Sequence, residues 1–318
     1  MDPSFAKLLS ASALLAFALP VAAADEDKPL TPADIVAKAP ESAWRKPSAD
    51  DIVVMEVGTA KAPVVFELAP RFAPAHAANI RAMVRGGYYD GLAILRVQEN
   101  YVTQWGDPGD PPMADNGKEK PLPDAARPRL PVEFATALKG LPFTPLKETD
   151  GWAKENGFVD GFPVAIDRER NIAWIAHCYG IVGSGRGAAA DSSNGSSLYA
   201  VIGQAPRGLD LNIPVVGRVL SGMENLTAWP RGKGNLGFYK AEETRPPLVR
   251  ARLLSMIPEA ERPAVTVLRD DTPTWAQWID SRRHRTGWFV HDPGRVDLCS
   301  TQAPARVVFP GTPAPTRP

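Results

Sequence analysis

The chain has 318 residues, of which 44% are hydrophobic and 23% charged, so it can bury a full core and hold one large domain with additional segments. Its 36 basic and 36 acidic residues cancel, which excludes the strong net field that draws proteins to nucleic acid, and we expect no nucleic-acid partner. The 33 prolines are about twice the usual share of roughly 5% and favour a loop-rich β protein over a helical bundle.

An export signal is predicted at the N-terminus. Lys7 precedes an apolar run at residues 8–19, and small residues with an A-x-A pattern follow up to Ala24. The run is shorter than the about 20 residues that span a bilayer. We therefore predict a signal peptide over residues 1–24, a periplasmic location and no stable membrane insertion; an uncleaved anchor is the alternative. Residues 25–49 are polar and Pro-rich and form a predicted N-terminal extension.

The first strands are predicted at residues 52–57 and 64–68, where mostly apolar runs flank a short turn. A helix is predicted to begin at Pro74, because proline fits the first helical position and apolar residues then recur at helical spacing. The glycine pair that follows ends it. Two polar residues on this helix are expected to cap it or to form surface hydrogen bonds: His76 and Asn79.

The polar turn at residues 98–100 lies between two strand-like runs, 93–97 and 101–105, a pattern typical of a tight β-hairpin. Alternate residues of a strand share a face, so each arm places one polar side chain among apolar neighbours, Arg96 on the first and Gln104 on the second. Periodicity alone leaves two interpretations open. The pair is either functional or an ordinary pair at the rim of the sheet whose polar groups reach water.

A long segment at about residues 108–170 is rich in Pro, Gly, Asp and Lys and shows little periodicity. We expect a long loop insertion, which is either a specificity feature or a surface decoration. Residues 257–318 contain several aromatic and arginine residues that suggest a helix or arm packed on the main domain, followed by a disordered Pro-rich tail. Apolar runs typical of strands lie between these segments, at 171–177, 198–202, 215–219 and 248–256.

Cys178 and Cys299 are the only cysteines. In an exported protein they could form one disulfide between the C-terminal segment and the main domain; two free buried thiols are the alternative. The four histidines include no close i, i+3 or i+4 pair, so we expect no metal site and no cofactor. Residues 183–187 are Gly-rich but lack the Gly-Lys-Ser/Thr ending of a phosphate loop, which favours a flexible loop beside a cleft.

Taken together, the segments at 64–79 and 86–108 resemble the cyclophilin family of peptidyl-prolyl isomerases, whose hairpin reads Phe-His-Arg-Val and then Phe-Met-x-Gln-x-Gly-Asp. Later segments match, in order, that family's Met-Ala-x-x-x-Gly, Asn-Gly-Ser-Gln-Phe-Phe, Leu-Asp and Phe-Gly-x-Val-x-x-Gly-Met patterns. The resemblance covers about residues 50–256. It implies a mainly β fold: a closed eight-stranded antiparallel barrel capped by two helices, carrying the insertion and the C-terminal extension.

The resemblance also implies the site residues, position by position. Arg96 matches the family's catalytic arginine and Gln104 its substrate-holding glutamine. Six further positions match residues that line the proline pocket or grip the peptide backbone: Tyr101, Val102, Ala176, His177, Tyr199 and Leu209. The chain departs from the family at four positions, where the usual His, Gln, aromatic residue and His are replaced by Leu95, Ser197, Gly208 and Ile213.

Rotation about an X-Pro bond meets a barrier of about 18–20 kcal/mol that arises from amide resonance. A catalyst therefore needs no nucleophile, only an apolar pocket for the ring and a donor to the prolyl nitrogen; arginine stays charged and offers five donors. The resemblance implies a monomeric prolyl isomerase that assists the folding of proline-containing exported polypeptides, with Arg96 as donor. A non-catalytic peptide-binding or chaperone module is the alternative, favoured by the four altered positions and opposed by the retention of Arg96 and Gln104.

Overall fold

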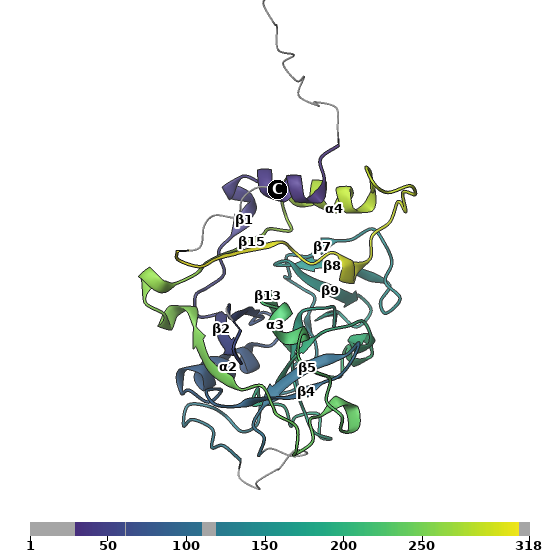
Figure 1. Cartoon of the computed structure of the whole chain (residues 1–318). Helices are drawn as coiled ribbons and strands as arrows, with labels where there is room; N and C mark the ends of the chain where they lie inside the picture. The colour runs from purple at the N-terminus through teal and green to yellow at the C-terminus, as the bar shows by residue number, and fades with distance from the viewer. Residues whose placement is uncertain (1–28, 61, 110–118, 312–318) are drawn as a thin grey trace, which may run out of the picture.

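The computed structural model describes residues 29–60, 62–109 and 119–311. The predicted signal peptide, residues 1–24, lies outside the described residues, as does the end of the Pro-rich tail. The described part of the chain contains four α-helices and sixteen strands, which form three antiparallel sheets (Figure 1). None of its helices has both the length and the apolar character needed to cross a bilayer.

The largest sheet is a nearly closed barrel of eight antiparallel strands in the order β14-β2-β3-β13-β11-β12-β5-β4. Its two edge strands approach each other at a bridge between Ala93 and Pro247, and the backbone N–H of Ile94 donates to Pro246 O at 2.8 Å. The barrel predicted from the sequence is therefore confirmed. Its strands are β2 (Ile52–Val57), β3 (Val64–Leu68), β4 (Ala93–Val97), β5 (Val102–Gly106), β11 (Ile181–Ser184), β12 (Leu198–Val201), β13 (Val215–Ser221) and β14 (Leu248–Leu253).

Two helices pack against the barrel core. The first, α2 (Pro74–Arg85), begins at the predicted proline and buries an apolar face that includes Ile80 and Val84. The second, α3 (Glu224–Thr227), is a single turn that inserts Leu226 into the same cluster of apolar side chains. The helix expected from Pro74 is thus confirmed. The two helices and the eight strands together contribute the side chains of the barrel core.

His76 and Asn79 lie on α2 but are buried, so the expected surface hydrogen bonding is wrong. His76 Nδ1 is 2.6 Å from a carboxylate oxygen of Glu133. Asn79 donates to Arg127 O at 3.0 Å and accepts from the backbone N–H of Arg127 at 2.7 Å. Both side chains are contacted from two sides. The insertion contributes Glu133 and Arg127, and the segment before β12 contributes Ser193 and Asn194.

The insertion is not one continuous loop, because parts of it form strands, and that expectation is corrected. It contains β6 (Thr136–Ala137), β7 (Thr144–Pro145), β8 (Glu155–Val159) and β9 (Phe162–Asp167), which form a five-stranded sheet with β10 (Ile172–Ile175) in the order β6-β10-β9-β8-β7. β10 is the strand expected at 171–177, yet it belongs to this sheet and not to the barrel. Composition concealed these strands, because Pro and Gly lie between short apolar runs.

The hairpin between β8 and β9 carried a signal that the composition obscured. Its turn is Asp160-Gly161, and both residues have positive φ, 53° and 75°. Asp-Gly between apolar runs is among the strongest short-range indications of a tight hairpin, because this turn needs left-handed backbone at both positions. The dipeptide predicts this hairpin once the apolar residues on either side are considered.

The terminal segments join the insertion in one additional unit. β1 (Trp44–Arg45), β15 (Ala264–Leu268) and β16 (Ala305–Val308) form the third sheet, and α1 (Pro32–Lys38) lies against α4 (Pro273–Arg283). Trp275 of α4 packs edge-on against Phe158 of β8 with ring centroids 4.8 Å apart. The C-terminal segment thus forms the expected helix, which lies beside the N-terminal helix at one end of the molecule (Figure 1). We call residues 29–49, 136–175 and 257–311 the accessory unit.

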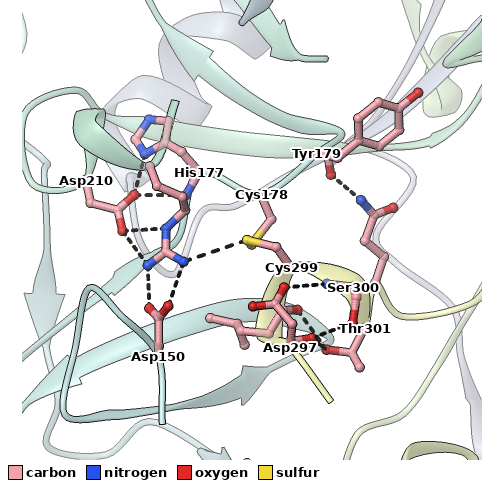
Figure 2. The surroundings of a disulfide bond; sticks show 12 residues. Asp150, His177, Cys178, Tyr179, Asp210, Asp297, Cys299, Ser300 and Thr301 are labelled. Carbon is pink, nitrogen blue, oxygen red and sulfur yellow. Dashed lines mark hydrogen bonds and ion pairs between the residues drawn. A yellow bond between two sulfur atoms is a disulfide. The ribbon is translucent and has the colours of Figure 1, made fainter. Parts of the chain in front are cut away.

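The accessory unit is tied to the barrel by a disulfide and by buried charges. Cys178, which precedes β11, is bonded to Cys299 with their Cα atoms 4.8 Å apart (Figure 2). Glu67 of β3 accepts hydrogen bonds from Arg45 of β1, the shortest at 2.6 Å, and from Arg218 of β13 at 2.9 Å. A buried carboxylate between two arginines is a compensated charge, whereas removal of one partner would leave an unpaired one.

Candidate active site

A cleft of about 500 Å³ opens on the barrel where β4, β5 and β12 meet. Six of the eight predicted site residues line it: Arg96, Tyr101, Val102, Gln104, Tyr199 and Leu209. Three of the four positions that depart from the family pattern line it as well: Leu95, Ser197 and Ile213. The structure thus gathers residues from four separate stretches of the chain into one concave surface.

Arg96 and Gln104 are brought together by the hairpin register. The two residues are direct cross-strand partners on β4 and β5, so their side chains share the face that lines the cleft. Gln104 Nε2 donates to the hydroxyl of Ser197 at 2.9 Å, so the amide is oriented by the residue that replaces the family's glutamine.

The guanidinium of Arg96 is held on several sides. It lies between the rings of Tyr101 and Phe238, 5.1 and 5.2 Å from their centroids. Its Nε donates to the backbone carbonyl of Leu236 at 2.6 Å, and Nη2 donates to the side chain of Gln98. Burial lowers the pKa of Arg96, but an arginine titrates so far above neutrality that it remains charged. The remaining donors of the fork are available to a peptide in the cleft.

The other part of the cleft is mainly apolar and is built around Tyr199. Its ring is 3% exposed and lies among Tyr101, Val102 and Leu209. A Cβ atom at Gly183 of β11 would lie 2.2 Å from this ring, so only glycine leaves room for it. Burial raises the pKa of Tyr199 well above its ordinary value, which keeps the phenol neutral. Such a surface fits a proline ring.

Ala176 and His177 do not line the cleft, and the position assigned to them is corrected. The backbone N–H of Ala176 donates to Pro163 O at 2.9 Å, and that of His177 donates to Asp210 at 3.0 Å. These backbone groups are therefore occupied within the protein. The strand that borders the cleft is β11, followed by Gly185 and Arg186. Sequence reasoning assigned the pair to the end of β10 because the segment at 171–177 was matched to the family's Met-Ala-x-x-x-Gly pattern.

Besides the three altered positions, eight residues that line the cleft were not predicted as site residues: Glu119, Gly185, Arg186, Gly187, Ser192, Asn194, Ser196 and Phe238. The Gly-rich stretch at 183–187 was expected beside a cleft, and its last three residues do line one. Phe238 lies in a segment without periodicity, so no local pattern places its ring over Arg96. In the described part of the chain, His, Cys, Asp and Glu side chains form no group of three or more that could hold a metal ion.

The family model for cyclophilin type peptidyl-prolyl cis-trans isomerases matches residues 52–253. The chain belongs to the cyclophilin family. The matched range begins with the first barrel strand, β2, and ends with the last, β14. By family and fold this cyclophilin is a peptidyl-prolyl cis-trans isomerase, an enzyme class whose substrates are proline-containing peptides.

One solved structure extends the likeness beyond the barrel. The cyclophilin AquaCyp293 from Hirschia baltica is similar with a TM-score of 0.69 and 25% sequence identity, covering 88% of this chain and 98% of its own. A cyclophilin type peptidyl-prolyl cis-trans isomerase from Cryptosporidium parvum, solved in the presence of the dipeptide Ala-Pro, has a TM-score of 0.41 and 15% identity and covers 64% of this chain and 98% of its own. A search of curated protein sequences finds no match.

Proposed function

We propose that this cyclophilin accelerates cis-trans rotation of X-Pro bonds in exported polypeptides and so assists their folding, with Arg96 as the catalytic donor. The observation that carries the proposal is the placement of one charged guanidinium at the edge of an apolar cleft, opposite Gln104 and between two aromatic rings. A proline ring against Tyr199 and its neighbours brings the prolyl nitrogen within reach of that donor.

The chemistry follows from how amide resonance changes during rotation. As the X-Pro bond twists, the nitrogen lone pair leaves conjugation and becomes a hydrogen-bond acceptor, which it is not in the planar amide. A donor placed at that nitrogen stabilises the twisted state more than the planar one, which is the condition for catalysis. Each 1.4 kcal/mol of such stabilisation raises the rate about tenfold. Gln104 would hold the flanking peptide backbone.

The place of action is proposed from the N-terminal sequence. The apolar run at residues 8–19 and the small residues up to Ala24 support export to the periplasm by a signal peptide over residues 1–24. A disulfide between Cys178 and Cys299 suits an oxidising compartment. We propose that the mature chain acts there as a monomer on flexible proline-containing segments.

The test compares the mature chain with Arg96→Ala in exchange NMR of a short X-Pro peptide. The wild type is expected to accelerate exchange, and Arg96→Ala to lose on the order of 10²-fold of the catalysed rate, as expected for loss of one preorganised donor. Arg231→Ala serves as the control. Arg231 pairs at 2.7 Å with Glu99, a residue of the hairpin turn, but does not line the cleft.

Two outcomes would contradict the proposal. Equal rates for the wild type and Arg96→Ala would remove Arg96 as donor. Binding of the peptide by a wild-type chain that leaves exchange unchanged would instead favour a peptide-binding or chaperone module. The four altered positions favour that alternative, as does the hydrogen bond between Arg96 and the carbonyl of Leu236, with which a substrate would compete.

A further inference from the structure

A chain of buried polar side chains runs from the accessory unit to the wall of the cleft. Arg207, in the short 3-10 helix η2 (Ala205–Leu209), forms a two-pronged ion pair with Asp150 of the accessory unit, in which Nη1 lies 3.0 Å from Oδ1. Arg207 Nε also donates to Asp210 at 3.1 Å. Asp210 lies 2.9 Å from His177 Nδ1, and His177 Nε2 lies 3.0 Å from the hydroxyl of Tyr199.

Each member of this chain is shielded from water. The side chains of Asp150, Arg207 and Asp210 are 4%, 7% and 7% exposed. Figure 2 shows Asp150 and His177 on opposite sides of this region, with Asp210 between them and the disulfide alongside. A buried polar group that loses its partner is strongly unfavourable, so the five residues constrain one another.

The charges of these buried side chains determine which atom donates and which accepts in each hydrogen bond. Burial would raise the pKa of Asp210, but the hydrogen bond from His177 and the positive charge of Arg207 hold it below its usual range. Asp210 is therefore an acceptor. With a neutral imidazole, Nδ1–H donates to Asp210 and Nε2 accepts from the neutral hydroxyl of Tyr199. The imidazole and phenol rings are nearly parallel, at 15°.

This series of buried polar side chains ends at two walls of the cleft. Tyr199 lines the cleft directly, and Leu209, which also lines it, is the residue before Asp210. The accessory unit covers the outer side of η2, because Trp152 lies over the guanidinium of Arg207, 5.7 Å away, and Cys299 Sγ lies 3.8 Å from Arg207 Nη1. The positions of Tyr199 and Leu209 thus depend on the contact between Arg207 and the accessory unit, which the barrel alone does not supply.

We propose that Asp150 and Arg207, acting through Asp210 and His177, are positioning residues that set the place of Tyr199 and Leu209 and so the fit of the cleft for a proline ring. The inference rests on the proposed function, since it assigns the proline ring to that wall. It makes the insertion a specificity feature of the enzyme and gives His177 a role behind the cleft in place of the backbone contact expected from the sequence.

The test uses Asp150→Asn, which keeps the shape of the side chain and removes its charge. Glu148→Gln is the control, because Glu148 is also a carboxylate of the accessory unit in a two-pronged pair with an arginine, Arg283, at 2.6 Å. The Glu148 side chain is 11% exposed, and its pair does not lead to the cleft. We expect Asp150→Asn to raise the Kd and KM of an X-Pro peptide about three- to tenfold with kcat changed less, and Glu148→Gln to change neither by more than about twofold.

A double-mutant cycle with Tyr199→Phe separates positioning from general loosening. Tyr199→Phe removes the hydroxyl at the end of the chain, so the effect of Asp150→Asn on Kd is expected to shrink in that background. An Asp150→Asn effect no larger than that of Glu148→Gln, or one of equal size with Phe at position 199, would overturn the proposal. If Asp150→Asn fails to fold, Tyr199→Phe alone tests the proposal. A peptide Kd that is the same for Tyr199→Phe as for the wild type would overturn it.

The Kd measurement also keeps this proposal distinct from the proposed catalytic function. Peptide binding is measured by NMR titration and needs no turnover. If the wild type binds peptide without accelerating exchange, the catalytic proposal fails while the effect of Asp150→Asn on Kd still tests the positioning proposal.

Discussion

At the scale of single residues, the N-terminus of α2 is capped by a carboxylate from a distant part of the sequence. The N-cap residue, Ala73, has no side chain that can accept a hydrogen bond. Glu133 takes over that task, accepting from the backbone N–H groups of Ala75 at 2.9 Å and His76 at 3.0 Å. A negative charge there also interacts favourably with the helix dipole. The same carboxylate contacts the ring of His76, so one residue ties the insertion to the helix.

This arrangement predicts a pH-dependent contribution of Glu133 to stability. Burial would raise the pKa of Glu133, but the hydrogen bonds from His76 and from the two backbone groups lower it below its usual value. A lowered folded-state pKa means that the stabilisation is complete above the unfolded value of about 4.3 and is lost as the pH falls through the folded value. We expect Glu133→Gln to lower the free energy of unfolding by about 1–3 kcal/mol at pH 7 and by progressively less below about pH 4.

Urea unfolding of the wild type and Glu133→Gln at several pH values measures this difference. Glu259→Gln, at an exposed glutamate, should show a difference near zero throughout. A Glu133→Gln difference that stays constant from pH 7 to pH 3.5 would show that the ionised carboxylate does not stabilise the fold.

At the scale of elements, the turn between β8 and β9 is the point where the barrel and two parts of the accessory unit meet. The backbone N–H of Gly161 donates to Asp270 at 2.7 Å, and its carbonyl accepts from Arg218 of the barrel. Gly161 has a φ of +75°, and a Cβ atom there would lie 2.8 Å from the side chain of Ala303 and 3.0 Å from the guanidinium of Arg218. Both backbone strain and crowding therefore require glycine at this position.

Gly161→Ala is accordingly expected to destabilise the chain by about 1–3 kcal/mol in urea unfolding. Gly151→Ala is the matched control in the same unit, because Gly151 has no positive φ and a Cβ atom there would meet nothing within 4 Å. Equal stability of the two variants would mean that the turn relaxes without loss of the contacts around it.

At the scale of the whole molecule, the accessory unit is assembled from three separate parts of the sequence around one core. Ile35 from the N-terminal segment, Phe158 from the insertion and Trp278 from the C-terminal segment are buried in the same cluster. The disulfide connects the C-terminal part to the chain just before β11, across a sequence separation of 121 residues.

Loss of this crosslink is expected to lower the free energy of unfolding by about 2–5 kcal/mol, because a long loop is no longer closed in the unfolded chain. Cys299→Ser and a reduced wild type should show the same loss. Dithiothreitol should leave the stability of Cys299→Ser unchanged, which controls for other effects of the reductant. Equal stability of the oxidised and reduced wild type would contradict the prediction.

The sequence by itself determined the elements whose signals are local. The strands at 52–57 and 64–68, the helix from Pro74 and the hairpin that pairs Arg96 with Gln104 follow from periodicity and turn chemistry in consecutive residues. The family patterns, also read along the chain, indicated the eight-stranded barrel. With only two cysteines, the sequence could name a single possible disulfide but could not establish that it forms.

Only the tertiary structure decided the remaining features, because each pairs residues that no local pattern relates. The backbone contact that holds Arg96 comes from 140 residues away, the cap of α2 from a segment 57 or 58 residues away, and the partner of His177 from 33 residues away. The insertion, which lacks periodicity over much of its length, folds because strands from it and apolar residues from both terminal segments share a core. Burial of that core, and not local propensity, gives these residues their structure.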